Sequence, residues 1–455
     1  MDINFEITFS KNIKETLNNV KGIDEVKEEI EQIIWMIKDP KKYLDAGAKL
    51  HKGILLCGKP GTGKTLIARA IAGDAGVNFI FLTGSDFDEM FVGVGAMRIR
   101  KIFKKARENA PCIIFIDEID SLLAGSRRSM EHSSSRATLN QFLAEMDGFS
   151  KLDNVFVIGA TNHEKDLDPA AVRPGRFDKT IHINIPDEEG RVDIINFYLN
   201  QIKLNKIDLD ARYLAKLTPG FTGAEIKNLV NLSILNALNH DKNQVDMEDF
   251  YEARDRVLMG IPRKSFSIPE KTRYHTSLHE AGHTLMCYKS LTCRNTLHKV
   301  TIIPRGSAAG VTLMLSDEEA LHSKSEFLTN IDTAMGGHVA EELLYGSDHV
   351  TAGCSSDLNK ATQIAQAMVK KFGMYGEKVG YIYVEDEGYQ WEEDEVSDKY
   401  KAKIDETVKV ILKESHDRVY ESLKESAVEL KNLAQKLYQY DTLNCKILTF
   451  NLYIS

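Results

Sequence analysis

The chain has 455 residues, of which 43% are hydrophobic and 27% charged, so it can bury large cores, and its composition argues against global disorder. At about 150 residues per domain, its length suffices for roughly three domains. The formal net charge of −9 disfavours a protein that holds nucleic acid on a basic surface, and we expect no nucleic-acid partner. Six scattered cysteines without a CxxC pair argue against a disulfide scaffold or a cysteine-zinc ribbon.

Residues 1–19 form an N-terminal segment with charges throughout, which is neither a signal peptide nor a membrane span. From 20 to 188, short apolar runs alternate with amphipathic stretches such as 64–73 and 98–109. The runs bounded by Gly, Asp or Pro predict buried strands at 53–57, 79–82, 112–116, 155–158 and 181–185. This alternation predicts an α/β domain with a parallel sheet and helices on both faces.

The rest of the chain is predominantly helical. Residues 189–258 predict an all-helical unit, and 259–271, with two Pro, one Gly and no periodicity, predict a linker. Residues 272–440 predict a second, mainly helical domain with a strand excursion at 299–315. The acidic stretch 385–398 is interpreted as a solvated loop, and the tail 441–455 is β-like.

A phosphate-binding motif lies between the first predicted strand and its helix. The pattern G-x-x-x-x-G-K-[ST] is matched by Gly58, Lys59, Pro60, Gly61, Thr62, Gly63, Lys64 and Thr65. Glycines let backbone N–H groups turn toward a β-phosphate, and the helix N-terminus favours the anion. Lys64 would neutralise β- and γ-phosphate oxygens, and Thr65 would bind Mg²⁺. These flanks make a simple Gly-rich turn an improbable alternative.

Polar residues follow two further strands. Asp117 and Glu118 end the run 112–116, where they would hold the Mg²⁺ shell and orient the attacking water. Taken alone, this pair is equally well an ordinary strand end. Asn162 lies four residues after the run 155–158, at the expected strand end, and would read the γ-phosphate. Arg173 and Arg176 are either cations for a phosphate or parts of a surface turn.

Together these motifs make residues 20–258 resemble the AAA module of the AAA+ ATPases. The resemblance implies that Asn162 is the first sensor. It also implies that Arg173 and Arg176 act on the nucleotide of a neighbouring subunit, in a ring that is usually a hexamer. The segment 220–225 resembles the lid region near the base and offers no Arg, so a charged second sensor is not supported.

The second domain opens with a metal motif. His279, Glu280 and His283 fit H-E-x-x-H, in which two imidazoles on one helix face reach one metal and the glutamate acts as general base. For this five-residue pattern alone, a metal site and a chance match in a helix with hydrogen-bonded histidines are about equally good interpretations. A third ligand is needed. Asp357 at a helix start is one candidate, although such an Asp is more often a helix cap; spacing leaves His338, Glu341 and Glu342 open as rivals.

The zinc motif follows an AAA module and precedes the segments 298–306, 340–342 and 356–358. In this combination, about residues 20–440 resemble the FtsH family of ATP-dependent zinc metalloproteases. The resemblance implies His279, His283 and Asp357 as zinc ligands and Glu280 as catalytic base. It also implies one Zn²⁺ per subunit, ATP and Mg²⁺ as cofactors, and protein substrates handled by a homo-hexameric ring. Phe91, Val92 and Gly93 would form the pore loop that grips the polypeptide; Phe91 alone would suggest a core aromatic.

The sequence departs from the family pattern in several places. Members usually carry one or two membrane spans before the AAA module, whereas this chain has about 20 residues there and no apolar run of about 18. We therefore expect a cytoplasmic, soluble chain that reaches the inner face of a membrane only through a partner or a missing anchor. Lys59 stands where Pro is usual and His338 where Arg is common, and the tail after 441 does not resemble the usual end.

These features predict an ATP-dependent zinc endopeptidase that unfolds proteins, threads them through a ring pore and hydrolyses them. The alternative is an AAA+ unfoldase or remodelling ATPase whose zinc site is not proteolytic.

Overall fold

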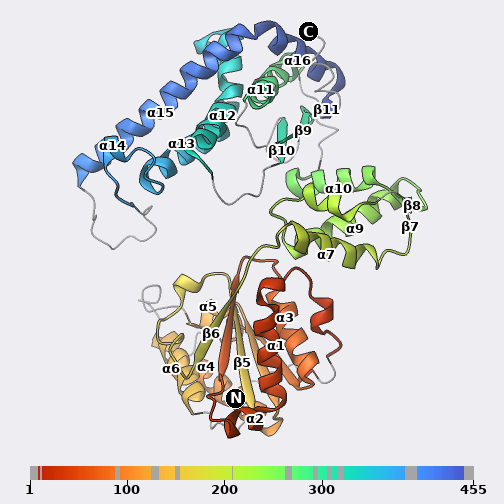
Figure 1. Cartoon of the computed structure of the whole chain (residues 1–455), viewed down its shortest axis with the longest axis vertical. Helices are drawn as coiled ribbons and strands as arrows, with labels where there is room; N and C mark the ends of the chain where they lie inside the picture. Colours follow the sequence, from red (N-terminus) through yellow and green to blue (C-terminus); the bar gives the residue numbers. More distant parts are fainter. Residues whose placement is uncertain are drawn as a thin grey trace. The chain divides into compact units, whose positions relative to one another are not determined.

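The computed structural model describes residues 9–10, 13–87, 93–123, 133–148, 154–207, 209–261, 269–290, 296–304, 310–315, 322–384 and 397–444. The chain forms two compact units, Met1–Val257 and Leu258–Ser455 (Figure 1). Several predicted features lie outside the described residues: 1–8, Phe91 and Val92 of the pore loop, 262–268 of the linker, 385–396 of the acidic stretch and 445–455 of the tail. None of the helices in the described ranges is both long enough and apolar enough to cross a membrane.

A six-stranded sheet forms the centre of the first unit. Its order is β1 (Phe9–Ser10), β3 (Asn78–Thr83), β4 (Cys112–Asp117), β5 (Val155–Thr161), β2 (Gly53–Gly58) and β6 (Phe177–Ile183). The five predicted strands are confirmed, and they pair in parallel. β1 pairs with β3 in the antiparallel sense. The sequence analysis missed β1 because two residues carry no periodicity.

Successive side chains along each strand point to opposite faces of this sheet, and each face has its own hydrophobic core. In β2, Ile54 and Leu56 pack with α1 (Asp24–Lys38) and α3 (Lys64–Ala75). Leu55 and Cys57 face the opposite core, with α4 (Val94–Glu108) and α6 (Ser133–Asp147). Short helices α2 (Pro40–Asp45) and α5 (Asp120–Leu123) complete this region. Helices thus cover both faces, as predicted, and Figure 1 shows the two layers.

Four helices follow the sheet, in the stretches where the sequence predicts them. They are α7 (Glu188–Leu199), α8 (Ala211–Lys216), α9 (Gly223–Asn239) and α10 (Met247–Met259). A short parallel pair, β7 (Asn205–Lys206) and β8 (Gln244–Val245), is an addition to the all-helical prediction. Arg191 is buried and donates to the carbonyl oxygens of Pro186 at 3.0 Å and Ala215 at 3.1 Å. This side chain therefore ties α7 to α8.

The second unit is mainly helical, as predicted. Its helices are α11 (Glu270–Lys289), α12 (Lys324–Tyr345), α13 (Ser355–Lys370), α14 (Gly376–Val379), α15 (Asp398–Glu425) and α16 (Ala427–Tyr440). The predicted strand excursion is a pair, β9 (Thr296–Thr301) and β10 (Val311–Leu315). β11 (Thr442–Asn444) pairs antiparallel with the other edge of β9. The sheet therefore draws part of the predicted tail into this unit.

Helices α11 and α12 approach each other closely at two glycines. A Cβ added to Gly282 would overlap the Gly336 carbonyl oxygen, and one added to Gly336 would lie 2.7 Å from the Gly282 carbonyl oxygen. The obstructing atoms are backbone, which cannot rotate away. Glycine at both positions is therefore a requirement of the crossing.

We predict that Gly336→Ala destabilises the second unit by about 1–3 kcal/mol, because overpacking forces the two helices apart. Denaturant unfolding of the full chain, followed by far-UV circular dichroism, measures this as a lower midpoint of one transition. The matched control is Gly353→Ala, where an added Cβ meets only the Thr351 hydroxyl at 3.2 Å. Equal midpoints for the two variants would contradict the close crossing.

Candidate nucleotide and zinc sites

The phosphate loop joins β2 to α3 and holds its lysine inward. Gly61 has φ 82° and Gly63 has φ 96°, in the left-handed region that favours glycine. Lys64 is nearly buried, and its Nζ donates to the carbonyl oxygens of Gly58 (2.8 Å) and Lys59 (2.9 Å) and to Asn162 Oδ1 (2.7 Å). The structure thus brings together Lys64 and Asn162, which are distant in the sequence. Burial lowers the pKa of Lys64, and the Asp117 carboxylate opposes this effect.

Hard oxygen donors converge beside the loop. Thr65 Oγ1 donates to Asp117 Oδ2 at 2.6 Å, which places a hydroxyl and a carboxylate together at the carboxyl edge of the sheet. Such oxygens are the ligands that Mg²⁺ prefers, so this donor set fits the ion. Glu118 follows at the strand end with φ 49° and an exposed side chain. The acid pair therefore faces the cavity beside the phosphate loop, which both residues line.

A cavity of about 410 Å³ extends from the loop toward the helical region. One part is lined by the phosphate loop, Asp117, Glu118 and Asn162, and another by Val20, Ile194, Phe197 and Tyr198. A cavity that is polar at one end and apolar and aromatic at the other matches the phosphates and the base of a nucleotide. The N-terminus of α9 closes onto the loop, because Ala224 N donates to the Gly61 carbonyl at 3.1 Å.

A cation on α9 also lines this cavity. The segment 220–225 contains no Arg, as noted in the sequence, but Lys227 lies one turn further along the helix. Gly223, Ala224 and Lys227 share one helix face, which lines the cavity, while Ile226 and Val230 are buried. The sequence analysis missed Lys227, although the Thr222–Glu225 capping box fixes the start of the helix and so its face.

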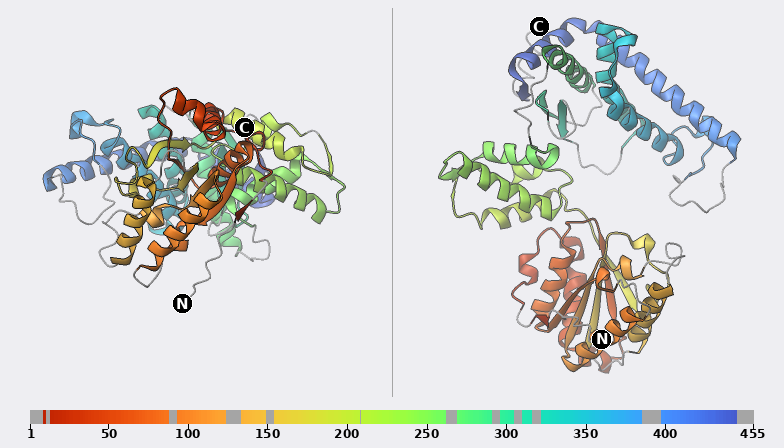
Figure 2. Two further views of the ribbon diagram at one scale, coloured as in Figure 1. Left: turned by 90° about the horizontal axis from the view of Figure 1, so that it is seen from below. Right: turned by 180° about the vertical axis from the view of Figure 1, so that it is seen from behind.

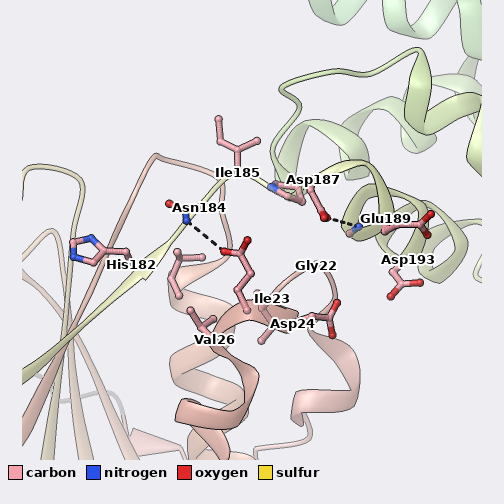
Figure 3. A pocket seen from close by; sticks show the side chains of 14 residues that line it. Gly22, Ile23, Asp24, Val26, His182, Asn184, Ile185, Asp187, Glu189 and Asp193 are labelled. Atoms are coloured by element: carbon pink, nitrogen blue, oxygen red, sulfur yellow. Dashed lines mark hydrogen bonds between the residues drawn. The ribbon is translucent and has the colours of Figure 1, made fainter. Parts of the chain in front are cut away.

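A second, smaller cavity of about 230 Å³ shares Gly22, Asn184 and Pro186 with the first (Figure 3). The acidic side chains among its lining residues are Asp24, Glu25, Asp187, Glu189 and Asp193. Asp187 caps the N-terminus of α7, because Gly190 N donates to its Oδ1 at 2.8 Å. This concentration of carboxylates repels phosphate groups, so an anionic nucleotide fits the larger cavity and not this one.

The two arginines predicted as fingers have different surroundings. Arg176 donates to both carboxylate oxygens of Asp147, at 3.0 and 2.9 Å, and to the Ala170 carbonyl at 2.6 Å. Arg173 accepts a hydrogen bond from Arg176 N through its carbonyl oxygen at 3.1 Å, while its side chain is exposed and contacts no charged or hydrogen-bonding group of the described residues. Neither lines the nucleotide cavity of its own chain. Of the predicted pore loop only Gly93 is described, with φ 89° at the start of α4.

The candidate zinc ligands converge from two helices. His279 and His283 lie one turn apart on α11, with their Nε2 atoms 3.1 Å apart. Asp357, in the first turn of α13, places Oδ2 at 3.2 Å from the first Nε2 and 3.3 Å from the second. Ligands held about 2.0–2.1 Å from a tetrahedral ion lie roughly 3.3 Å from one another. The three atoms therefore match the spacing of a zinc site.

The opposite ring nitrogens orient the two imidazoles. His279 Nδ1 lies 2.8 Å from Glu341 Oε1, and His283 Nδ1 lies 2.8 Å from the Thr333 carbonyl oxygen. Both Nδ1 atoms can donate to these oxygens, which leaves the Nε2 atoms facing Asp357. Burial raises the pKa of Asp357, but its hydrogen bonds to His279 and His283 bring the pKa well below the usual range. Asp357 is therefore anionic, as a zinc ligand must be.

The rival third ligands lie elsewhere. Glu341 contacts the far side of His279, and its second oxygen accepts from Thr351 N at 2.8 Å. Glu342 accepts from His416, and His338 lies beside that pair. Among the residues left open by spacing, the geometry therefore favours Asp357.

Glu280 lies next to the ligands and is almost fully buried, at 5% exposure. Burial raises the pKa of its carboxyl, against the opposing charges of His283 and His279. Thr312 Oγ1 on β10 donates to Glu280 Oε2 at 2.5 Å, so the carboxylate is held by the edge of the small sheet. A carboxyl with a raised pKa beside a metal site suits proton transfer.

Family descriptions match three parts of the chain: "ATPase family associated with various cellular activities (AAA)" at 54–185, "AAA+ lid domain" at 208–252 and "Peptidase family M41" at 266–449. The chain is 45% identical over 432 residues to ATP-dependent zinc metalloprotease YME1L1 of Mus musculus. It is 44% identical over 440 residues to ATP-dependent zinc metalloprotease FtsH 1 of Bdellovibrio bacteriovorus. The alignments cover 95% and 94% of this chain, and 59% and 67% of those relatives. The chain belongs to the FtsH family.

A third relative is the mitochondrial inner membrane i-AAA protease supercomplex subunit YME1 of Saccharomyces cerevisiae, 44% identical over 428 residues. That alignment covers 94% of this chain and 56% of the relative. The chain thus spans less than two thirds of the length of its YME1-type relatives.

Several residues that shape this FtsH-family zinc site were missed by the sequence analysis. An added Cβ at Gly337 would lie 2.6 Å from the Nε2 atoms of both His279 and His283, so only glycine leaves the ligand atoms clear. The Thr333 carbonyl oxygen contacts His283 Nδ1, and the Thr312 hydroxyl donates to Glu280. The adjacent glycines inside a helix, Gly336 and Gly337, were the available indication, because glycine in a helix interior usually has a packing reason.

We predict that Gly337→Ala weakens zinc binding by at least about tenfold, the lower end of what displaced metal-site neighbours cost, because its methyl group would occupy the space between the two imidazoles. Competition titration of the full chain with a zinc-binding dye measures the affinity, and circular dichroism checks the fold. Gly223→Ala serves as control, since an added Cβ there meets nothing nearer than 3.8 Å. Unchanged zinc affinity in Gly337→Ala would place the ion elsewhere.

Proposed function

We propose that this chain is an ATP-dependent zinc metalloendopeptidase, which unfolds protein substrates, moves them through the pore of a ring and hydrolyses them. The observation that carries the proposal is the presence, in one chain, of a nucleotide cavity with its acid pair and a buried H-E-x-x-H site with three ligand atoms at zinc spacing. Relatives that align with about 95% of the chain are named ATP-dependent zinc metalloproteases.

In the nucleotide site, each residue has a proposed role that follows from its position. The backbone of Gly58–Gly63 surrounds the phosphates, Lys64 neutralises their charge, and Thr65 and Asp117 hold Mg²⁺. Glu118, exposed at the cavity edge, orients the attacking water. Asn162 contacts Lys64 at 2.7 Å, within reach of a γ-phosphate bound to that lysine, which supports a sensor role.

Ring assembly is proposed from the arginines. The Arg173 side chain is exposed and without a partner among the described residues, so its guanidinium is free to approach the nucleotide of a neighbouring subunit. Arg176 is held by Asp147, and this pair fixes the turn that presents Arg173. A homo-hexameric ring would bring each Arg173 to the next cavity. Phe91, Val92 and Gly93 would then line the pore and grip the polypeptide.

In the protease site, His279, His283 and Asp357 would hold the ion. Zinc, when bound there, would supply Lewis acidity that polarises the peptide carbonyl and lowers the pKa of water toward about 7. Oε2 of Glu280 accepts a hydrogen bond from Thr312, so Oε1 would take the proton of the attacking water. The same oxygen would return that proton to the leaving amine nitrogen. Glu341 and Thr333 keep both imidazoles oriented throughout.

Proteolysis of folded substrates would need to be coupled to ATP hydrolysis, because their peptide bonds are protected by the fold. Native proteins are stable by about 5–15 kcal/mol, so a buried peptide bond seldom becomes accessible on its own. A zinc site that hydrolyses peptide bonds would act on such a substrate only after mechanical unfolding.

We predict that Glu280→Gln lowers ATP-dependent degradation of casein by at least about 100-fold, because the general base is lost. ATP hydrolysis should stay at the wild-type rate, since the residues of the nucleotide cavity are unchanged. The assay uses the purified full chain with Zn²⁺ and compares ATP with no nucleotide. Glu377→Gln, at an exposed glutamate of α14, is the matched control.

The outcomes separate the two candidate functions. ATP hydrolysis without casein cleavage by the wild-type chain would favour the remodelling ATPase. Full cleavage activity in Glu280→Gln would contradict the role of Glu280 as general base.

A second prediction tests the ring. Arg173→Ala and Glu118→Gln should each reduce ATP hydrolysis by at least about tenfold, because each removes one side of a shared site. Co-expressed mixtures of the two variants should recover activity, because some interfaces then pair an intact Arg173 with an intact Glu118. Arg212→Ala, at an exposed arginine of α8, is the control. Mixtures that stay as inactive as the single variants would contradict action between subunits.

A further inference from the structure

Another group of side chains of the kinds that bind metals lies in the second unit, apart from the zinc site. His338 and Glu342 are one turn apart on α12, and His416 comes from α15. One ligand atom from each lies within 4.8 Å of the others. The two helices pack against each other, and the right view of Figure 2 shows them side by side.

The cluster has its own orientation. Glu341 and Glu342 are neighbours on α12, so their side chains leave the helix about 100° apart. Glu341 contacts His279 of the zinc site, whereas Glu342 Oε2 lies 2.7 Å from His416 Nε2 and 4.0 Å from His338 Nε2. The zinc site and the second cluster therefore lie on different faces of α12, although Glu341 and Glu342 are adjacent in the sequence.

An ion pair explains only part of this cluster. His416 and Glu342 form a short contact, and Asp417 Oδ1 lies 3.4 Å from His416 Nδ1, which keeps Nε2 directed at Glu342. His338 remains unexplained. Its Nδ1 is buried without a hydrogen-bond partner, and its Nε2 is too far from Glu342 for a hydrogen bond. A buried polar atom without a partner is a typical indication of an unseen water or ion.

The donor set defines the chemistry of the occupant. Two imidazole nitrogens and one carboxylate suit zinc and similar divalent transition ions more than Mg²⁺ or Ca²⁺, which prefer oxygen ligands. All three side chains are half-buried, so the cluster is within reach of solvent. Glu342 Oε2 lies 2.7 Å from His416 Nε2 and 4.0 Å from His338 Nε2, so changes of about 1 Å would bring each of these two pairs to the roughly 3.3 Å spacing of a tetrahedral site.

We propose that His338, Glu342 and His416 form a second divalent-metal site that joins α12 to α15. An ion there binds His338 Nε2, which is too far from Glu342 for a hydrogen bond, and cross-links the helix that carries Gly336, Gly337 and Glu341. Those three residues set the packing and orientation of His279 and His283. The second ion thus stabilises the frame of the zinc site without touching its ligands.

The test is zinc stoichiometry. The full chain is dialysed to equilibrium against micromolar free Zn²⁺, and bound metal per chain is measured by mass spectrometry. We expect two ions for the wild type and one each for His338→Gln and His416→Gln. His349→Gln, at an exposed histidine of the same unit, should keep two. Circular dichroism confirms that each variant is folded.

Thermal unfolding supplies a readout independent of activity. Zn²⁺ should raise the midpoint of the wild type by several degrees more than that of His338→Gln, because binding to the native state stabilises it. His338→Gln is the decisive variant, since it leaves the His416–Glu342 ion pair intact. One ion in the wild type, or two in His338→Gln, would overturn the proposal.

Discussion

The close crossing of α11 and α12 is the contact on which the zinc site depends. Gly282 and Gly336 let two backbones meet, and neither position tolerates a Cβ. This proximity places Thr333, Gly337 and Glu341 of α12 directly against the imidazoles of α11. Their donors and acceptors then determine which nitrogen of each histidine faces Asp357. Metal chemistry at this site is therefore a consequence of helix packing.

The nucleotide site uses a comparable contact between backbones. Gly61 of the phosphate loop accepts a hydrogen bond from Ala224 at the start of α9, and an added Cβ on Gly61 would lie 2.9 Å from Thr222 Oγ1. The helical region and the phosphate loop therefore share one surface around the cavity. A change in the position of α9 alters the space for phosphate and base together, because Lys227 and the loop line the same cavity.

The sequence predicted the architecture well, for reasons that are local. Strands buried on both faces are continuous apolar runs, and the phosphate loop and H-E-x-x-H are contiguous patterns, so each can be recognised within a few residues. Asp357 is different: spacing left four candidates, and its place beside His279 depends on how α13 packs. Gly337 and Thr312 escaped prediction because their roles exist only across the contacts between separate elements. Lys227 was hidden for the same reason.

The position of β11 affects the order in which this chain can fold. β11 pairs with β9, and Thr442 Oγ1 lies 2.8 Å from Thr301 Oγ1, 141 residues earlier. β9 in turn pairs with β10, the strand that holds Glu280. A ribosome that has made the H-E-x-x-H helix must therefore add more than a hundred further residues before this sheet can close. Contacts so distant in sequence form slowly. The small sheet whose strand β10 contacts Glu280 thus stays incomplete until β11 has been made, and the surroundings of the H-E-x-x-H helix are completed last.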